Sequence, residues 1–425
     1  MNNRDDEPSR GSRSMTDEER ELWKRAIAAS SEKKIATHDL LCQAFLLRCP
    51  GHVGALALRL RALAALWRFD DCQTLIGETS ALVDVERQRI TWGTAVGDYL
   101  SKYGYHAEAE YLLRDLCDPY PEPPMHVSIA IIDSVVAQGH LHRAMREIDA
   151  LWARAPNGPH DSNREIQILE TRAQILRSLG RFDAALGVLD ILDALEPGAN
   201  NQLRDDIEGA VQALNQIADS EDSTLWKAAL AAFSDQRSST CDVLCEAYLE
   251  RHPGNLPAQA LRLHALADLG RFDDCEDLIG ETGSSMNDEQ WLAWAPALAD
   301  YLSRRGHHAD AEKVLREACA RNGEPPVYLV VAVAESLCEQ GKLREGLIEV
   351  ESLLAHLERG RSEVDFGYHT HILQMRVQLL RSLGRFEDAL DAFVSLDAFV
   401  PGDNDDLRRD LEEAIHARRH LPWSN

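Results

Sequence analysis

The sequence lacks any long apolar stretch and has few features of an exported protein. None of its 425 residues lies in a run near the roughly eighteen apolar residues that a membrane-spanning helix needs. The opening string MNNRDDEPSRGSRSMTDEE has no apolar core, so we expect a disordered tail over residues 1–18 rather than a signal peptide or anchor. The nine cysteines form no dense framework, which favours reduced thiols. These features predict a cytoplasmic protein.

Positive charge is also scarce. Lys and Arg number 45 against 71 Asp and Glu, which gives a formal net charge of −26. Such a surface repels nucleic-acid phosphates and anionic lipids and favours basic partners. We therefore expect no nucleic acid and no membrane among the partners. Acidity also keeps proteins dispersed in solution, so the charge alone does not establish a basic partner.

Recognised catalytic and ligand-binding signatures are absent as well. The chain contains no Walker loop, G-x-G-x-x-G, G-x-S-x-G, H-E-x-x-H or C-x-x-C string. The pair His140 and His142 and the pair His369 and His371 are each spaced by two residues, which points them to different faces of a helix. Cysteines at equivalent repeat positions are typical of small buried core residues. We predict no enzyme activity, no cofactor and no metal.

A long internal duplication is present instead. RFDDCQTLIGET at Arg68 matches RFDDCEDLIGET at Arg271, 203 residues later. DYLSKYG at Asp98 matches DYLSRRG at Asp300, 202 residues later. Matches in the same order and at nearly the same offset indicate two homologous halves.

A shorter period runs inside each half. Each turn glycine follows one apolar helical segment and precedes another, and a small residue stands five positions after it, at spacings of 35 to 43 residues. Pro156, Pro197 and Pro401 each fall seventeen residues after their glycine. Since a lone helical hairpin cannot bury its apolar stripe, stacked neighbours are expected. The turn glycines are Gly104, Gly139, Gly180, Gly270, Gly306, Gly341 and Gly384.

This pattern of helix, glycine turn, small residue and closing proline resembles the tetratricopeptide repeat. The resemblance implies an all-α fold, an α-solenoid of helical hairpins in a right-handed superhelix, with two five-hairpin halves that each end in a capping helix. The predicted domains are 19–218 and 219–420, followed by a tail over 421–425. The ten units begin near Glu19, Val53, Ile90, Met125, Ile166, Asp222, Leu256, Leu292, Val327 and Thr370.

The resemblance also implies that the first helix of each pair lines a concave face. We predict a partner-binding groove with a central acidic stripe and basic flanks, suited to a basic or mixed-charge protein segment; a solvated helix face is the alternative. The corresponding positions are Arg61, Asp98, Asp133 and Gln174 in the first half and His264, Asp300, Glu335 and Gln378 in the second, with Lys102, Arg177, Arg304 and Arg381 one turn further on.

The functional hypothesis is a scaffold or chaperone-like adaptor for a protein partner. The alternative is a regulatory subunit of an enzyme or secretion assembly that contacts partners through the array ends. Trp23 and Trp226 match between the halves and suit either an exposed anchor or closure of the hydrophobic stack. Self-association through the duplicated halves is a further possibility.

Overall fold

The computed structural model describes residues 15–79, 86–120, 122–154, 162–282, 286–321, 325–359, 366–402 and 404–421. Within them every regular element is helical, namely α1 to α22 and one short 3-10 helix, η1. Most of the tail predicted for residues 1–18 lies outside the described residues. Helix α1 begins at Asp17, because Thr16 Oγ1 accepts a hydrogen bond from the Glu19 amide at 3.2 Å and the Glu19 side chain accepts one from the Thr16 amide.

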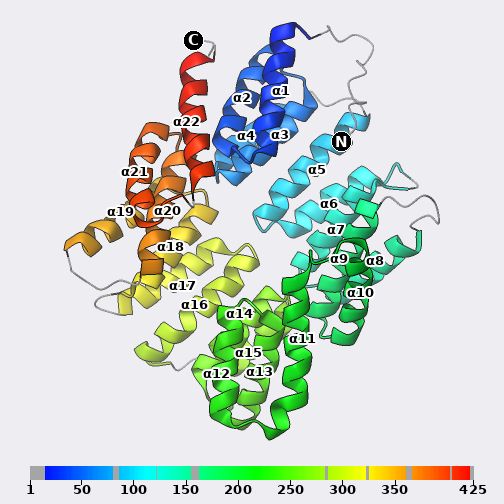
Figure 1. The fold of residues 1–425 in the computed structure, drawn as a ribbon, viewed down its shortest axis with the longest axis vertical. Helices are drawn as coiled ribbons and strands as arrows, with labels where there is room; N and C mark the ends of the chain where they lie inside the picture. Colours follow the sequence, from blue (N-terminus) through cyan, green and yellow to red (C-terminus); the bar gives the residue numbers. More distant parts are fainter. Residues whose placement is uncertain are drawn as a thin grey trace. The chain divides into compact units, whose positions relative to one another are not determined.

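The ten predicted hairpins are confirmed, five in each half, and successive hairpins follow one another along the chain (Figure 1). Those of the first half are α1 (Asp17–Ser31) with α2 (Ile35–Arg48), α3 (Val53–Ala65) with α4 (Phe69–Thr79), α5 (Glu86–Lys102) with α6 (His106–Cys117), α7 (Met125–Ala137) with α8 (Leu141–Arg154), and α9 (Ser162–Ser178) with α10 (Phe182–Leu195). Those of the second half are α12 (Asp222–Ser234) with α13 (Ser238–Arg251), α14 (Leu256–Asp268) with α15 (Phe272–Thr282), α16 (Asp288–Arg304) with α17 (His308–Arg321), α18 (Val327–Glu339) with α19 (Leu343–Arg359), and α20 (Phe366–Ser382) with α21 (Phe386–Phe399).

The turn inside each hairpin needs a left-handed backbone. All seven predicted turn glycines have positive φ, for example Gly180 at 68°. The Arg181 amide then donates to the Leu176 carbonyl at 2.9 Å, which closes the end of α9 as in a Schellman turn. Lys33 and Gln236 take the same conformation in the first and sixth hairpins, where the sequence has no turn glycine.

The second helix of each pair packs through the predicted apolar stripe. Ala185, Leu189 and Leu192 are fully buried on α10. All nine cysteines lie in the described residues, and none forms a disulfide. Cys42 and Cys275 are completely buried, and burial raises the pKa of each thiol to about 12. The core-packing interpretation is confirmed for Cys42, Cys72, Cys241, Cys245 and Cys275, which are buried, whereas Cys117 and Cys319 are only half-buried.

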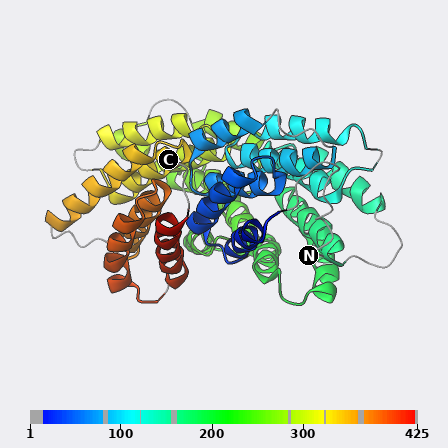
Figure 2. The same cartoon turned by 90° about the horizontal axis from the view of Figure 1, so that it is seen from above.

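One further helix follows the fifth hairpin of each half, as predicted: α11 (Asn201–Gln216), continued by η1 (Ile217–Asp219), and α22 (Asp405–His420). We expected these helices to face solvent as caps. Instead, α11 packs against α13 and α22 packs against α2, where the red C-terminal helix lies beside the blue N-terminal ones in Figures 1 and 2.

Because of these contacts, the chain clusters into two compact units that each contain helices from both halves. One unit comprises Met1–Val96 with Leu354–Asn425, and the other comprises Gly97–Leu353. The predicted domains 19–218 and 219–420 follow the duplication in the sequence and stay a prediction.

Candidate partner-binding surface

A buried aspartate makes each of the two terminal-helix contacts. Asp206 on α11 accepts hydrogen bonds from the amides of Ser239 (3.2 Å) and Thr240 (3.0 Å). Its own carbonyl accepts from Thr240 Oγ1 at 2.8 Å. These amides belong to the first turn of α13, where no intrahelical acceptor is available, so the carboxylate satisfies them and complements the helix dipole. We call this contact the inner junction.

The end junction is its counterpart between α22 and α2. Asp410 accepts from the amides of Ala36 (3.1 Å) and Thr37 (2.9 Å), and its carbonyl accepts from Thr37 Oγ1 at 3.0 Å. Asp206 and Asp410 are each 1% exposed. Sequence analysis missed both residues, although each lies in the duplicated register.

Two of the predicted groove residues belong to these junctions. Arg177 lies 3.4 Å from Asp206, and Arg381 lies 3.4 Å from Asp410. Arg381 is buried, and burial lowers the pKa of its guanidinium while Asp410 opposes the shift. Both arginines therefore neutralise a buried carboxylate.

Nine of the twelve predicted residues lie in the unit Gly97–Leu353 and three in the other unit. In the unit Gly97–Leu353, Gln174 is exposed on α9 and Glu335 is exposed on α18. The three in the other unit differ in burial, because Arg61 is exposed on α3, Gln378 is half-buried on α20, and Arg381 is buried at the end junction.

The acidic stripe of the first half is represented by Asp98 on α5 and Asp133 on α7, both with exposed side chains. Although Asp133 touches solvent, the surrounding protein desolvates its carboxylate. This desolvation, together with the negative charge of Asp98, raises the pKa of Asp133 to about 6. The Lys102 side chain is exposed one turn after Asp98.

The corresponding acid of the second half is compensated within the protein. Asp300 Oδ2 lies 3.1 Å from His264 Nδ1, and Asp300 Oδ1 lies 3.2 Å from Arg304 Nε. Arg304 also lies 3.1 Å from Asp268. Burial would raise the pKa of Asp300, but the hydrogen bond from His264 and the charge of Arg304 hold it below its usual value.

The halves also approach each other within this unit. A Cβ added to Gly104 would lie 2.2 Å from the Gly306 Cα, so only two glycines allow these turns to meet. His106 and His308 follow the two turns, and burial lowers the pKa of both imidazoles. An ion pair of 4.0 Å between Arg177 and Asp268 also joins the halves.

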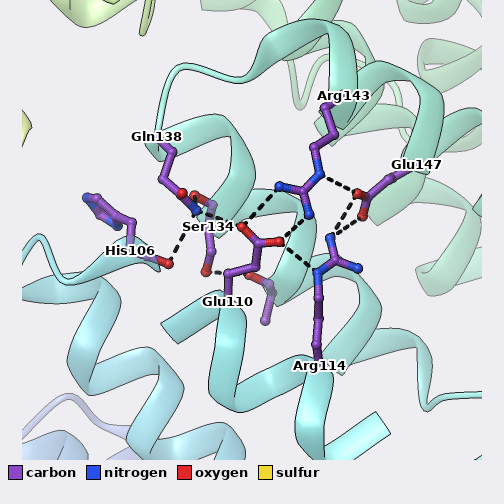
Figure 3. A network of polar contacts seen from close by, with 8 residues as sticks. His106, Glu110, Arg114, Ser134, Gln138, Arg143 and Glu147 are labelled. Atoms are coloured by element: carbon purple, nitrogen blue, oxygen red, sulfur yellow. Dashed lines mark hydrogen bonds and ion pairs between the residues drawn. The ribbon is translucent and has the colours of Figure 1, made fainter. Parts of the chain in front are cut away.

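A second polar network missed by sequence analysis links α6, α7 and α8 (Figure 3). Glu110 accepts from Arg114 Nε at 2.7 Å and from Gln138 Nε2 at 2.9 Å, and it also pairs with Arg143. Arg114 continues to Glu147 at 2.8 Å. Burial alone would raise the pKa of Glu110, but these hydrogen bonds lower it.

The Glu110 network has a counterpart 202 residues later. Glu312 accepts from Arg316 Nε at 2.7 Å and from Gln340 Nε2 at 2.9 Å. Because cations and amides compensate each carboxylate, both networks hold adjacent hairpins together rather than offering a reactive acid or base. The matching Glu, Arg and Gln positions in the two halves were the signal available in the sequence.

The remaining candidate features are metal sites, membrane-spanning helices and the two tryptophans that match between the halves. Among the described residues, no group of three or more His, Cys, Asp and Glu side chains is placed to hold a metal ion. No described helix is both long enough and apolar enough to cross a membrane. Trp23 packs on Phe45 with ring centroids 5.3 Å apart, and Trp226 packs on Tyr248 at 5.5 Å. Both tryptophans are half-buried in their own hairpins.

The fold defines the class: an all-α repeat protein of tetratricopeptide-like hairpins. No protein-family model matches the chain, and no curated protein matches its sequence.

Several solved structures of helical-repeat proteins resemble the chain. A tetratricopeptide repeat protein from Parabacteroides merdae is 14% identical over 77% of this chain and 99% of its own, with a TM-score of 0.31. Yeast Tom70 is 15% identical over 94% of this chain and 89% of its own, with a TM-score of 0.38. Maize PPR10 in complex with an 18-nt RNA element is 14% identical over 96% of this chain and 70% of its own, with a TM-score of 0.31. At these scores the likenesses carry no argument about function.

Proposed function

We propose that the protein is a non-catalytic scaffold or chaperone-like adaptor that binds a basic or mixed-charge segment of a protein partner. The surface responsible contains Asp98 and Asp133, with Lys102 and Gln174 as further contacts. The observation that carries this proposal is a pair of exposed carboxylates, Asp98 on α5 and Asp133 on α7. Desolvation and the charge of Asp98 raise the pKa of Asp133 to about 6. A lysine or arginine from a partner would relieve the repulsion between these two acids.

In the equivalent surface of the second half, Asp300 interacts with His264 and Arg304. We assign the main binding role to the first half, because desolvation and the charge of Asp98 raise the pKa of Asp133 there. The net charge of −26 disfavours nucleic acid as the ligand. The nine thiols without disulfides suit the reducing cytoplasm.

The alternative, a regulatory subunit that binds through the array ends, has less support. The end junction covers the faces of α2 and α22 that such a contact would use. Trp23 and Trp226 pack within their hairpins, which favours closure of the hydrophobic stack over an exposed anchor.

Affinity capture with matched variants tests the assignment. Asp98→Asn with Asp133→Asn should lose the captured partner, and raised salt should weaken its binding to the wild type. The control removes two exposed carboxylates from α6 and its end, Asp115→Asn with Asp118→Asn, and should retain the partner.

A second-half variant, Asp300→Asn with Glu335→Gln, should also retain it. Loss of the partner from the control, or its retention by the first-half variant, would contradict the assignment. Circular dichroism of all variants confirms that they are folded.

A further inference from the structure

Each half of the chain contains the residues for both sides of a junction. Its final helix, α11 or α22, carries a buried aspartate. The first turn of its second helix, α2 or α13, provides two backbone amides and a threonine hydroxyl. Each junction has three hydrogen bonds. The donor–acceptor distances of equivalent bonds in the inner junction and the end junction differ by no more than 0.2 Å. The pairs of matching residues are Asp206 with Asp410, Ser239 with Ala36, and Thr240 with Thr37.

The two junctions differ in how the chain connects their sides. Asp206 and Thr240 are 34 residues apart, so the connection through α12 holds the inner junction together. Asp410 and Thr37 are separated by 373 residues, at opposite ends of the chain. No short connection enforces the end junction, so a second copy can supply the same helix with the same bonds.

We propose that the end junction is an exchangeable interface and that its partner is a second copy of this chain. Each copy places its α22 on the α2 of the other, so that every hydrogen bond of the closed chain is kept. The exchange is reciprocal and gives a closed two-fold dimer with no unsatisfied junction. Within one chain the tether raises the effective concentration of α22, so the closed monomer dominates at low protein concentration.

An additional ion pair allows the end junction to be altered by mutation without changing the inner junction. Lys34 Nζ lies 2.5 Å from Glu413 Oε1, with side chains 12% and 48% exposed. The inner junction lacks this pair, because Arg237 and Gly209 occupy the equivalent positions. Charge reversal at Lys34 or Glu413 therefore leaves the inner junction and both buried aspartates intact; Lys34 also pairs with Glu32 at 2.6 Å within its own hairpin.

The test is a charge-swap complementation. Lys34→Glu places two acids against each other, and Glu413→Lys places two bases against each other, both in the closed monomer and in a dimer of either variant with itself. In a mixed dimer, one junction pairs the two substituted side chains, a glutamate with a lysine, and the other pairs the native Lys34 with the native Glu413. The two variants are refolded from urea separately and together, and masses are measured by light scattering.

The expected result is a species of twice the 47.5 kDa chain mass, several-fold more abundant in the mixture than in either variant alone. The double variant Lys34→Glu, Glu413→Lys restores attraction within one chain and should stay monomeric at the same concentration. A mixture that stays at single-chain mass would overturn the proposal. Equal dimerisation of each variant alone would overturn it too, because association would then not depend on the end junction. Circular dichroism distinguishes either outcome from misfolding.

Discussion

Single residues decide how closely the two halves approach in the unit Gly97–Leu353. The turn glycines share a positive φ, yet their surroundings differ. Gly104 and Gly306 meet backbone to backbone, whereas nothing lies within 4 Å of a Cβ added to Gly180. The positive φ therefore disfavours a side chain at Gly104, Gly306 and Gly180 alike. At Gly104 and Gly306 a side chain would also collide with the backbone of the opposite turn.

Alanine substitutions separate these two causes. Gly180→Ala should lower the free energy of unfolding by about 1–2 kcal/mol, the cost of a left-handed alanine. Gly104→Ala should cost a further ~1–3 kcal/mol, because its Cβ must displace the Gly306 backbone. Urea denaturation of the two variants measures the difference. Equal losses would show that the two turns do not touch in solution.

The ionisation of a single residue, Asp133, makes the stability of the folded protein depend on pH. Its pKa is raised to about 6 from an unfolded value of about 3.9, so the folded protein binds the proton more tightly. The stability contribution of this group is complete below pH ~4 and is lost as pH rises through about 6.

Asp133→Asn removes this titration. The variant should match the wild type at pH 4 and exceed it in stability at pH 7, when both are followed by thermal unfolding. Asp115→Asn, which removes an exposed carboxylate from α6, serves as the control. A variant that is no more stable than the wild type at pH 7 would contradict the desolvation of Asp133.

Helices α2 and α13 begin in an unusual way, since carboxylates from distant helices bind their first-turn amides. Such amides ordinarily lack an intrahelical acceptor. The closure of hairpins by glycine turns was predictable, because one residue type fits a positive φ. Lys33 and Gln236 were not predictable as turn residues, because their conformation is imposed by the hairpin around them.

Hydrogen exchange tests these helix starts directly. We expect slow exchange at the amides of Ala36, Thr37, Ser239 and Thr240. The first turn of α10 should exchange quickly, because its N-cap Arg181 makes no side-chain bond to the helix. Asp410→Asn should speed exchange at Ala36 and Thr37 while the amides at 239 and 240 stay protected. Unchanged protection at 36 and 37 would show that Asp410 does not bind these amides in solution.

For the whole molecule, the sequence predicted the duplication, the ten hairpins and the helix that ends each half. It did not predict where those final helices bind, because Asp410 and Thr37 lie at opposite ends of the chain. His264 and Asp268 in the second half replace Arg61 and Ala65 in the first. The contacts of His264 with Asp300 and of Asp268 with Arg304 become apparent only in three dimensions.

The central claim is that the carboxylates of the first half bind a cationic protein segment. The most direct measurement is calorimetric titration with an arginine-rich peptide and with the same peptide carrying neutral citrulline in place of arginine. We expect the arginine peptide to bind more tightly, and more tightly at pH 7.5 than at pH 5, where Asp133 is largely protonated.

Asp98→Asn with Asp133→Asn should weaken binding about tenfold, as expected for two ion pairs of about 0.7 kcal/mol each. The Asp115→Asn, Asp118→Asn control, with the same net charge, should bind like the wild type. Equal affinities for the two peptides, or equal losses in the two variants, would contradict the claim.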